Sequence, residues 1–235
     1  MKIKCVWEHN GNDTLLYSSN FIGAFTRGAS KEIALSKMQS EVEAYLRWKN
    51  EALGEISEVS IEQEKASTID VCDADSDVIF EEEKKPLTMD EYRELKALAL
   101  KSARDFLVLY ESIPDKHVSC LEPKKTFLGM KPCTAEEMYV HTKSVNSYYF
   151  GEIGVDADNE STIYDCRKRG FEELEKQGNF LENKVILGSY DEEWSLRKVL
   201  RRFIWHDRIH GKAMYRMAVK TFGAGSCADV FRFEG

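Results

Sequence analysis

The longest helical pattern in the chain spans residues 189–223 and restricts the fold more than any other feature. Apolar side chains recur there every three or four residues and form one stripe about 100° wide on a helix. The stripe contains Leu196, Val199, Phe203, Ala213, Met214 and Met217. His206 and His210 lie one turn apart inside it, so both imidazoles are expected to face the interior. The opposite side, where we expect the helix to meet water, carries Arg197, Arg201, Arg208 and Lys212.

A pair of interior histidines needs partners, because a buried imidazole loses free energy when its ring nitrogens make no hydrogen bonds. Histidines at i and i+4 are close enough to share one metal ion. Hydrogen bonds to a carbonyl or a carboxylate would satisfy each ring equally well. The same spacing occurs in HExxH metalloproteases, but those place glutamate directly after the first histidine, where this chain has Asp207. The pattern therefore disfavours a protease.

A third histidine strengthens the metal interpretation. His141 lies in a second helical pattern, where Met138, Val145 and Tyr148 share its side, so it is also expected to face inward. One divalent cation bound by His141, His206 and His210 would satisfy all three rings and leave a fourth position for water or substrate. Glu137 and Tyr148, one turn before and two turns after His141, are candidates for acid/base catalysis or for hydrogen bonding to the ligands. Glu137 has an alternative role as a helix cap.

Composition sets the broad class. The chain has 235 residues, of which 43% are hydrophobic and 31% charged, as in ordinary globular proteins. It has neither an apolar run of 18 residues nor a secretory leader, and its six cysteines include no CxxC pair, so a cytoplasmic protein with reduced thiols and no membrane span is expected. The net charge is −8 and basic residues are not concentrated, which disfavours nucleic-acid binding.

The first 85 residues predict a small α+β domain. They carry 10 Lys and Arg against 17 Asp and Glu, so most of the negative charge lies here. An Asn-Gly turn between two β-prone segments predicts a hairpin, and Ser30 is placed to cap a helix that extends to about residue 52. The expected extended segments are residues 2–7, 14–19, 21–28, 56–61 and 78–80.

Residues 86–235 predict a four-helix bundle with a C-terminal tail. A charged run that ends at Pro86 marks the boundary between the two domains. Capping boxes are expected at Thr88, Thr134 and Ser189, each with glutamate three residues later. The predicted helices are residues 89–113, 135–150, 161–177 and 189–223. Trp194 and Trp205 lie off the apolar stripe of the last helix and are expected to pack against the first domain or a neighbouring subunit, which leaves a homodimer open.

Two stretches resemble known families. FIGAFTRGASKEIALSKMQSEVEAYLRW, after a hairpin, resembles the HicB-like domain, and this resemblance implies only the fold of residues 1–85. A helix with one inward histidine followed by W-S-L-R-x-V-L-x-x-x-x-W-H-x-x-x-H resembles the DinB/YfiT-like superfamily of four-helix-bundle metalloenzymes. That resemblance implies a Zn²⁺ or Ni²⁺ ion on His141, His206 and His210, and it includes S-transferases that use low-molecular-weight thiols.

The sequence thus favours a metal-dependent enzyme that activates water or a low-molecular-weight thiol against a small-molecule substrate, as a hydrolase or a thiol S-transferase. The competing hypothesis is a non-catalytic interaction module in which any metal is structural. A third hypothesis is that the basic side of the last helix docks onto the acidic first domain of the same chain or of a second one.

Overall fold

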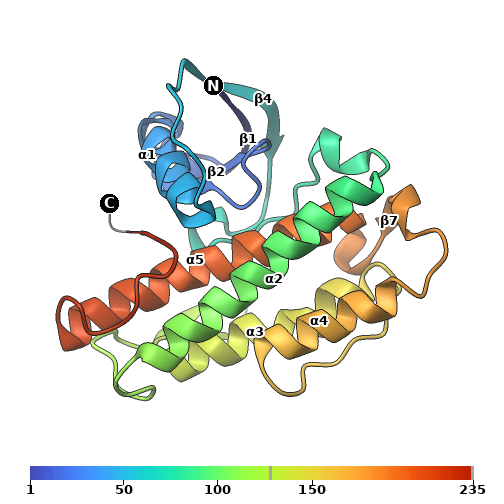
Figure 1. Ribbon diagram of the computed structural model, residues 1–235. Coiled ribbons are helices and arrows are strands. Elements are labelled where there is room, and N and C mark those ends of the chain that lie inside the picture. Colours follow the sequence, from blue (N-terminus) through green and yellow to red (C-terminus); the bar gives the residue numbers. More distant parts are fainter. Residues whose placement is uncertain (127–128, 234–235) are drawn as a thin grey trace.

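The structure, a computed structural model, describes residues 1–126 and 129–233. It is a mixed α/β fold in which a small sheet lies on one side of a set of helices (Figure 1). Within the described ranges, every helix is too short or too polar to cross a membrane.

The sheet has four strands in the order β3-β2-β1-β4, formed by β1 (Lys2–Asn10), β2 (Asp13–Ser18), β3 (Phe25–Gly28) and β4 (Glu58–Ala66). The predicted hairpin is present: β1 and β2 pair antiparallel, and Gly11 at the turn has the positive φ that the Asn-Gly pair favours. Helix α1 (Lys31–Lys49) begins at Ser30 as predicted, because the Ser30 hydroxyl accepts a hydrogen bond from the Ile33 amide.

The prediction of a strand at residues 78–80 is wrong. Side chains take the hydrogen bonds of this backbone instead of a neighbouring strand. The Arg201 guanidinium donates to the Val78 carbonyl at 2.9 Å, and the Gln63 amide donates to the Ile79 carbonyl at 2.8 Å. The segment is buried, which explains why its apolar pattern resembles a strand.

Four helices follow: α2 (Met89–Ser112), α3 (Ala135–Gly151), α4 (Ile163–Leu174) and α5 (Leu196–Phe222). Helices α2 and α3 both contact α4 and α5. The capping boxes at Thr88 and Thr134 form as predicted. A short hairpin of β5 (Lys124–Thr126) and β6 (Gly129–Lys131) lies in the connection between α2 and α3.

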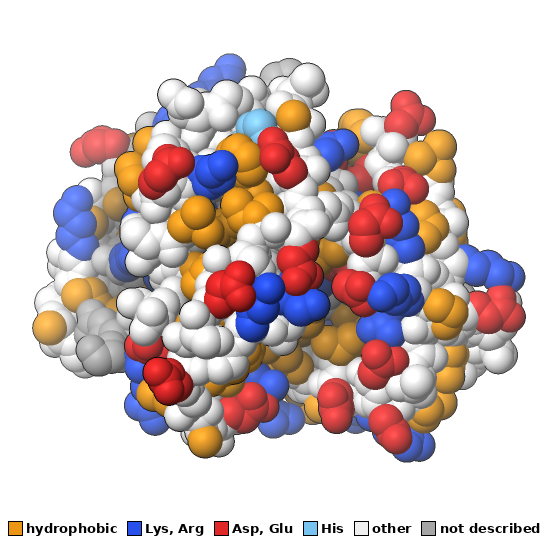
Figure 2. Space-filling model, turned by 90° about the horizontal axis from the view of Figure 1, so that it is seen from above, with side chains coloured by type: hydrophobic (Ala, Val, Ile, Leu, Met, Phe, Trp, Pro, Cys, Tyr) orange, Lys and Arg blue, Asp and Glu red, His pale blue; other side chains and the backbone are white. Residues whose placement is uncertain are grey.

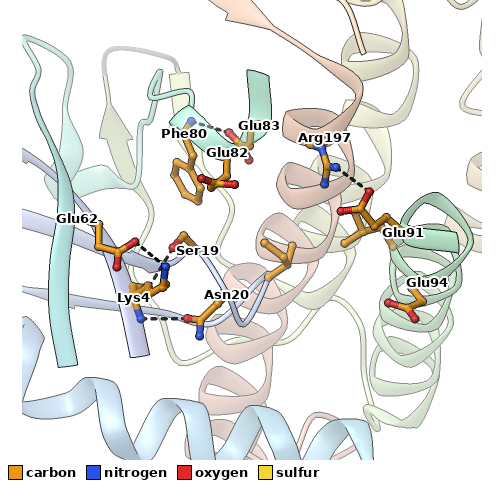
Figure 3. A pocket seen from close by; sticks show the side chains of 12 residues that line it. Lys4, Ser19, Asn20, Glu62, Phe80, Glu82, Glu83, Glu91, Glu94 and Arg197 are labelled. Atoms are coloured by element: carbon orange, nitrogen blue, oxygen red, sulfur yellow. Dashed lines mark hydrogen bonds and ion pairs between the residues drawn. The ribbon is translucent and has the colours of Figure 1, made fainter. Parts of the chain in front are cut away.

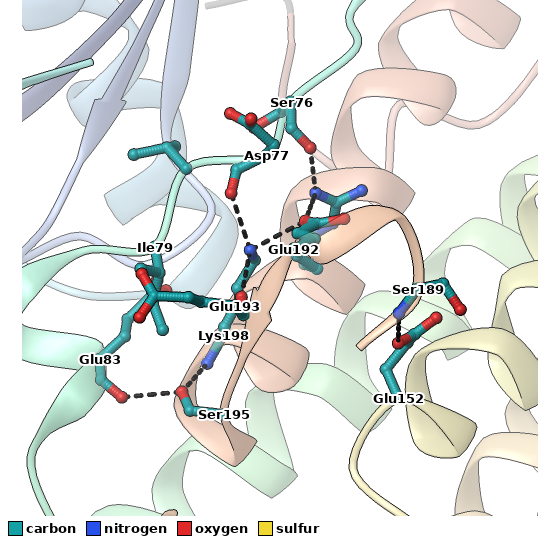
Figure 4. Close-up of polar contacts among 12 residues, drawn as sticks. Ser76, Asp77, Ile79, Glu83, Glu152, Ser189, Glu192, Glu193, Ser195 and Lys198 are labelled. Carbon is teal, nitrogen blue, oxygen red and sulfur yellow. Dashed lines mark hydrogen bonds and ion pairs between the residues drawn. The ribbon is translucent and has the colours of Figure 1, made fainter. Parts of the chain in front are cut away.

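The capping box predicted at Ser189 does not form. A two-residue ladder between β7 (Ile186–Leu187) and β8 (Glu193–Trp194) holds this segment in a hairpin, so α5 begins after Ser195, whose hydroxyl accepts the Lys198 amide. The Ser189 amide donates to Glu152 at 2.8 Å. Glu192, expected to complete the box, pairs with Lys198 instead (Figure 4).

Helix α5 lies between the sheet and helices α3 and α4 (Figure 1). The prediction that its basic side meets water is wrong, because Arg201 and Arg208 are buried against acidic side chains of the first 85 residues. Arg201 pairs with Glu83, whereas Arg208 and Lys212 both donate to Glu41, at 2.7 and 2.8 Å. The hypothesis that this basic side docks onto the acidic part is therefore confirmed within one chain.

The two tryptophans differ in their packing. Trp205 packs edge-on against Tyr17 of β2, with ring centroids 5.7 Å apart, so its predicted contact with the first part of the chain is confirmed. Trp194 is fully buried on the other side, against Tyr148 and Tyr149 of α3. Figure 2 shows the outer face above the sheet, where acidic and basic side chains are interspersed with hydrophobic ones.

Lys198 joins the sheet side to the start of α5. Its fully buried ammonium donates to the carbonyls of Asp77 and Glu193 at 2.9 and 2.7 Å and lies 2.8 Å from the Glu192 carboxylate (Figure 4). Burial lowers the pKa of Lys198 to about 8, although Glu192 opposes the shift. The folded protein therefore releases this proton more readily than the unfolded chain does.

The lowered pKa of Lys198 predicts how stability changes with pH. Between about pH 8 and 10.5 the unfolded chain binds the proton and the folded chain does not, so this group makes folding more favourable as pH rises, by up to about 1.4 kcal/mol per unit. Urea unfolding of the wild type and of Lys198→Met at about pH 7.5 and 10 isolates the effect. The wild type should gain on the variant, and a difference independent of pH would contradict the assigned pKa.

Candidate metal centre

Three histidines from two helices converge at one point. His141 comes from α3, and His206 and His210 come from successive turns of α5. The ring centroids of His206 and His210 are 4.3 Å apart, and those of His141 are 4.6 Å from His210 and 5.2 Å from His206. The structure thus brings together the three residues that the sequence selects.

The local sequence explains this convergence. The i, i+4 spacing places His206 and His210 on one side of α5, and that side packs against α3. The capping box at Thr134 fixes where α3 begins, and hence which turn of α3 carries His141 to the level of the α5 pair.

The three histidines differ in exposure. His206 is buried with 6% of its surface exposed, His210 is partly buried, and His141 is exposed. The prediction that all three side chains are interior is therefore wrong for His141, which lies at the rim of the helical packing. Its ring nevertheless faces the other two. The centre is consequently closed on the His206 side and open to solvent on the His141 side.

The environment keeps the imidazoles neutral near pH 7. Burial lowers the pKa of His206 well below its usual value, and the neighbouring histidines add to the shift. Burial lowers the pKa of His210 to about 3, with further contributions from His141, Lys131 and Arg27. Burial against the other rings also lowers the pKa of His141. A metal ligand must be unprotonated, so all three rings are in the required state.

The geometry fits one small cation. The Nδ1 atom of His206 is buried and has no hydrogen-bond partner among the described residues. One ligand nitrogen from each ring lies within 4.8 Å of the other two. Zinc–nitrogen bonds of about 2.0–2.1 Å in a tetrahedral site place ligand nitrogens roughly 3.4 Å apart, so ring shifts of about 1 Å are enough to complete it.

Residues that the sequence did not select surround the centre. Tyr149 packs edge-on to His206 with centroids 6.0 Å apart, and the Arg202 guanidinium lies 5.1 Å from the Tyr149 ring. Arg27 of β3 and Lys131 of β6 bring positive charge toward His210. Helical spacing from His141 could have suggested Tyr149, at the edge of the same side. Nothing in the sequence links Arg27 or Lys131 to α5.

The two candidate acid/base residues have other partners. The Glu137 carboxylate accepts hydrogen bonds from the amides of Cys133 and Thr134, at 2.9 and 3.1 Å, and these bonds lower its pKa. Glu137 thus has the capping role that was its alternative. Tyr148 packs against Trp194, and burial raises its pKa well above the usual value.

Asp207, which follows the first histidine of the HxxxH pair, is directed elsewhere. It is fully buried, forms a two-point ion pair with Arg167, and accepts a hydrogen bond from the Ser102 hydroxyl. A carboxylate held in this way cannot serve as the general base that an HExxH protease needs. The structure therefore supports the exclusion of protease chemistry that the sequence indicated.

Comparison of the chain with protein-family models, with curated proteins and with solved structures finds no match in any of the three. The two family resemblances remain predictions from the sequence, and the functional argument depends on the geometry of the histidines.

Proposed function

We propose that the chain binds one divalent ion, Zn²⁺ or Ni²⁺, through His141, His206 and His210, and that it is a hydrolase or a thiol S-transferase. The observation that carries the proposal is the convergence of three neutral imidazoles, one with an unpartnered buried nitrogen, beside an opening to solvent. Imidazole ligands suit zinc and nickel, whereas magnesium and calcium prefer oxygen ligands.

In this proposal, residues 1–85 are a HicB-like α+β domain and residues 86–235 a DinB-like four-helix bundle with a tail. Three neutral ligands leave the ion's charge uncompensated, and such an ion lowers the pKa of a bound water or thiol toward 7. Arg27 and Lys131 extend the positive potential to the His210 side, so a substrate with negative charge is favoured. Tyr149 limits the movement of the His206 ring.

Metal content and an open coordination position test the proposal together. Protein purified without chelator should contain about one ion per chain. After replacement by Co²⁺, its visible spectrum should change when a small thiol such as 2-mercaptoethanol is added, because the thiol takes the fourth position. Absence of metal would overturn the proposal. A cobalt spectrum unaffected by thiol and pH would instead favour a structural ion in an interaction module.

A further inference from the structure

A second candidate site lies on the other side of α5. A cavity of about 500 Å³ opens between α1, β3, α5 and the C-terminal segment. Its cationic lining consists of Arg27, Lys37, Arg47, Lys212 and Arg216, and its acidic lining of Glu41 and Glu43. Lys212 contacts Glu41 of α1, whereas His210 contacts His141 of α3, so the cavity and the histidine centre face different neighbours of α5.

Most of this positive charge is not neutralised by the protein. Glu41 is already shared between Lys212 and the buried Arg208, and Glu43 accepts the Gln39 amide at 3.0 Å. The remaining cations donate only to backbone carbonyls or form no ion pair with a carboxylate in the described ranges. Lys37 donates to the Arg27 carbonyl at 2.9 Å, and Arg27 donates to the Cys72 carbonyl.

The two other arginines carry the strongest indication of a ligand. Arg47 has a buried Nε with no hydrogen-bond partner among the described residues, and a buried donor left unpaired costs about 1–3 kcal/mol. Arg216 is exposed and forms no ion pair with any described carboxylate. Guanidinium groups donate in a planar fork that matches the oxygens of carboxylate and phosphate.

A neighbouring cavity shows that such an imbalance is not general. The cavity of about 420 Å³ between the sheet and α2 is rich in glutamate, yet most of its carboxylates have a cation (Figure 3). Lys4 lies 3.3 Å from Glu62 and Arg197 lies 3.0 Å from Glu91. In a chain of net charge −8, the unpaired cations of the first cavity therefore stand out as a specific feature.

We infer that the cavity lined by Arg27, Lys37, Arg47 and Arg216 binds a small organic anion that carries a phosphate group or two carboxylates. Such a ligand supplies acceptors for the unpaired guanidinium groups. Phe233 lies beside the cations, with the Lys212 ammonium 5.6 Å from its ring centroid, so the C-terminal segment forms part of the wall. The site is separate from the proposed metal centre and does not depend on it.

Calorimetric titration with inorganic phosphate and with succinate tests the inference. Arg216→Gln should weaken binding at least about tenfold, because a charge-assisted hydrogen bond contributes about 1.5–3 kcal/mol. The matched control is Lys220→Gln, which removes an exposed cation one turn further along α5, outside the cavity, and should change affinity little. Binding of phosphate alone would identify a phosphoryl ligand, and binding of succinate alone a dicarboxylate.

Three results would overturn the inference. The first is no detectable binding of either anion at about millimolar concentration. The second is an equal loss in Arg216→Gln and Lys220→Gln, which would indicate attraction to net charge only. The third is loss of binding in His210→Ala, which would place the anion on the metal. Binding that persists in His210→Ala supports the cavity even if the chain proves to bind no metal.

Discussion

The Arg167→Met variant is expected to lose about 3–5 kcal/mol of unfolding free energy, the largest stability effect that the structure predicts for one side chain. Arg167 and Asp207 are both completely buried, and two guanidinium nitrogens contact the two carboxylate oxygens. Methionine fills similar space but leaves Asp207 charged and unpaired, with only the Ser102 hydroxyl to stabilise it. Urea unfolding measures the loss.

A double variant separates the ion pair from simple packing. Arg167→Met with Asp207→Leu removes both charges and should recover most of the lost free energy, because a buried pair contributes little relative to apolar residues of similar volume. Lys168→Met, at an exposed neighbour of Arg167, is the control and should stay within about 0.5 kcal/mol of the wild type. A single variant as stable as the wild type would contradict the prediction.

The Arg167→Met defect should also depend on pH. Burial already raises the pKa of Asp207, and Arg167 opposes that shift. Without Arg167 the pKa in the folded state rises further above the unfolded value. Stability is then retained at low pH, where Asp207 is protonated, and lost as pH rises through the folded pKa. The deficit relative to the wild type should therefore shrink as the solution is acidified.

The second large effect is on metal affinity, where removing any one of the three histidines should weaken binding by two to three powers of ten. Structural zinc sites contribute about 10–16 kcal/mol through four ligands, or roughly 3–4 kcal/mol for each. His141→Ala is the cleanest variant because His141 is exposed, so metal should be lost with little change in folding. Competition with a chromogenic chelator measures the affinity.

His9→Ala is the matched control for the metal experiment. His9 lies on β1, where its ring nitrogen pairs with Glu64 at 3.0 Å, and it takes no part in the histidine cluster. Its removal should leave metal affinity unchanged. Equal metal content in His141→Ala and the wild type would place any bound ion elsewhere and would remove the basis for the proposed enzyme.

The sequence predicted the features that depend on short-range pattern. The hairpin, the starts of α1, α2 and α3, and the existence of four long helices follow from turn, capping and periodicity signals that act over a few residues. The three histidines could also be grouped, because helical spacing gives the side of the helix and burial gives the need for a partner.

The features that depend on distant partners were not predictable. Ser189 has the residues of a capping box, but its amide donates to Glu152, 37 residues away. Arg201 looks like a surface residue from periodicity, yet it is buried because Glu83 lies opposite. Periodicity also fixes direction without depth, so it placed His141 on the correct side and could not show that it lies at the rim.

The ion pairs on the back of α5 have a consequence for any attempt to divide the protein. A fragment of residues 86–235 would present Trp205, Arg201 and Arg208 to water, and its counterpart would hold Glu41 and Glu83 without counter-charges. We expect either piece alone to aggregate and the two, coexpressed, to reassociate. The helix that supplies two of the histidines is thus shaped by a neighbour that touches none of them.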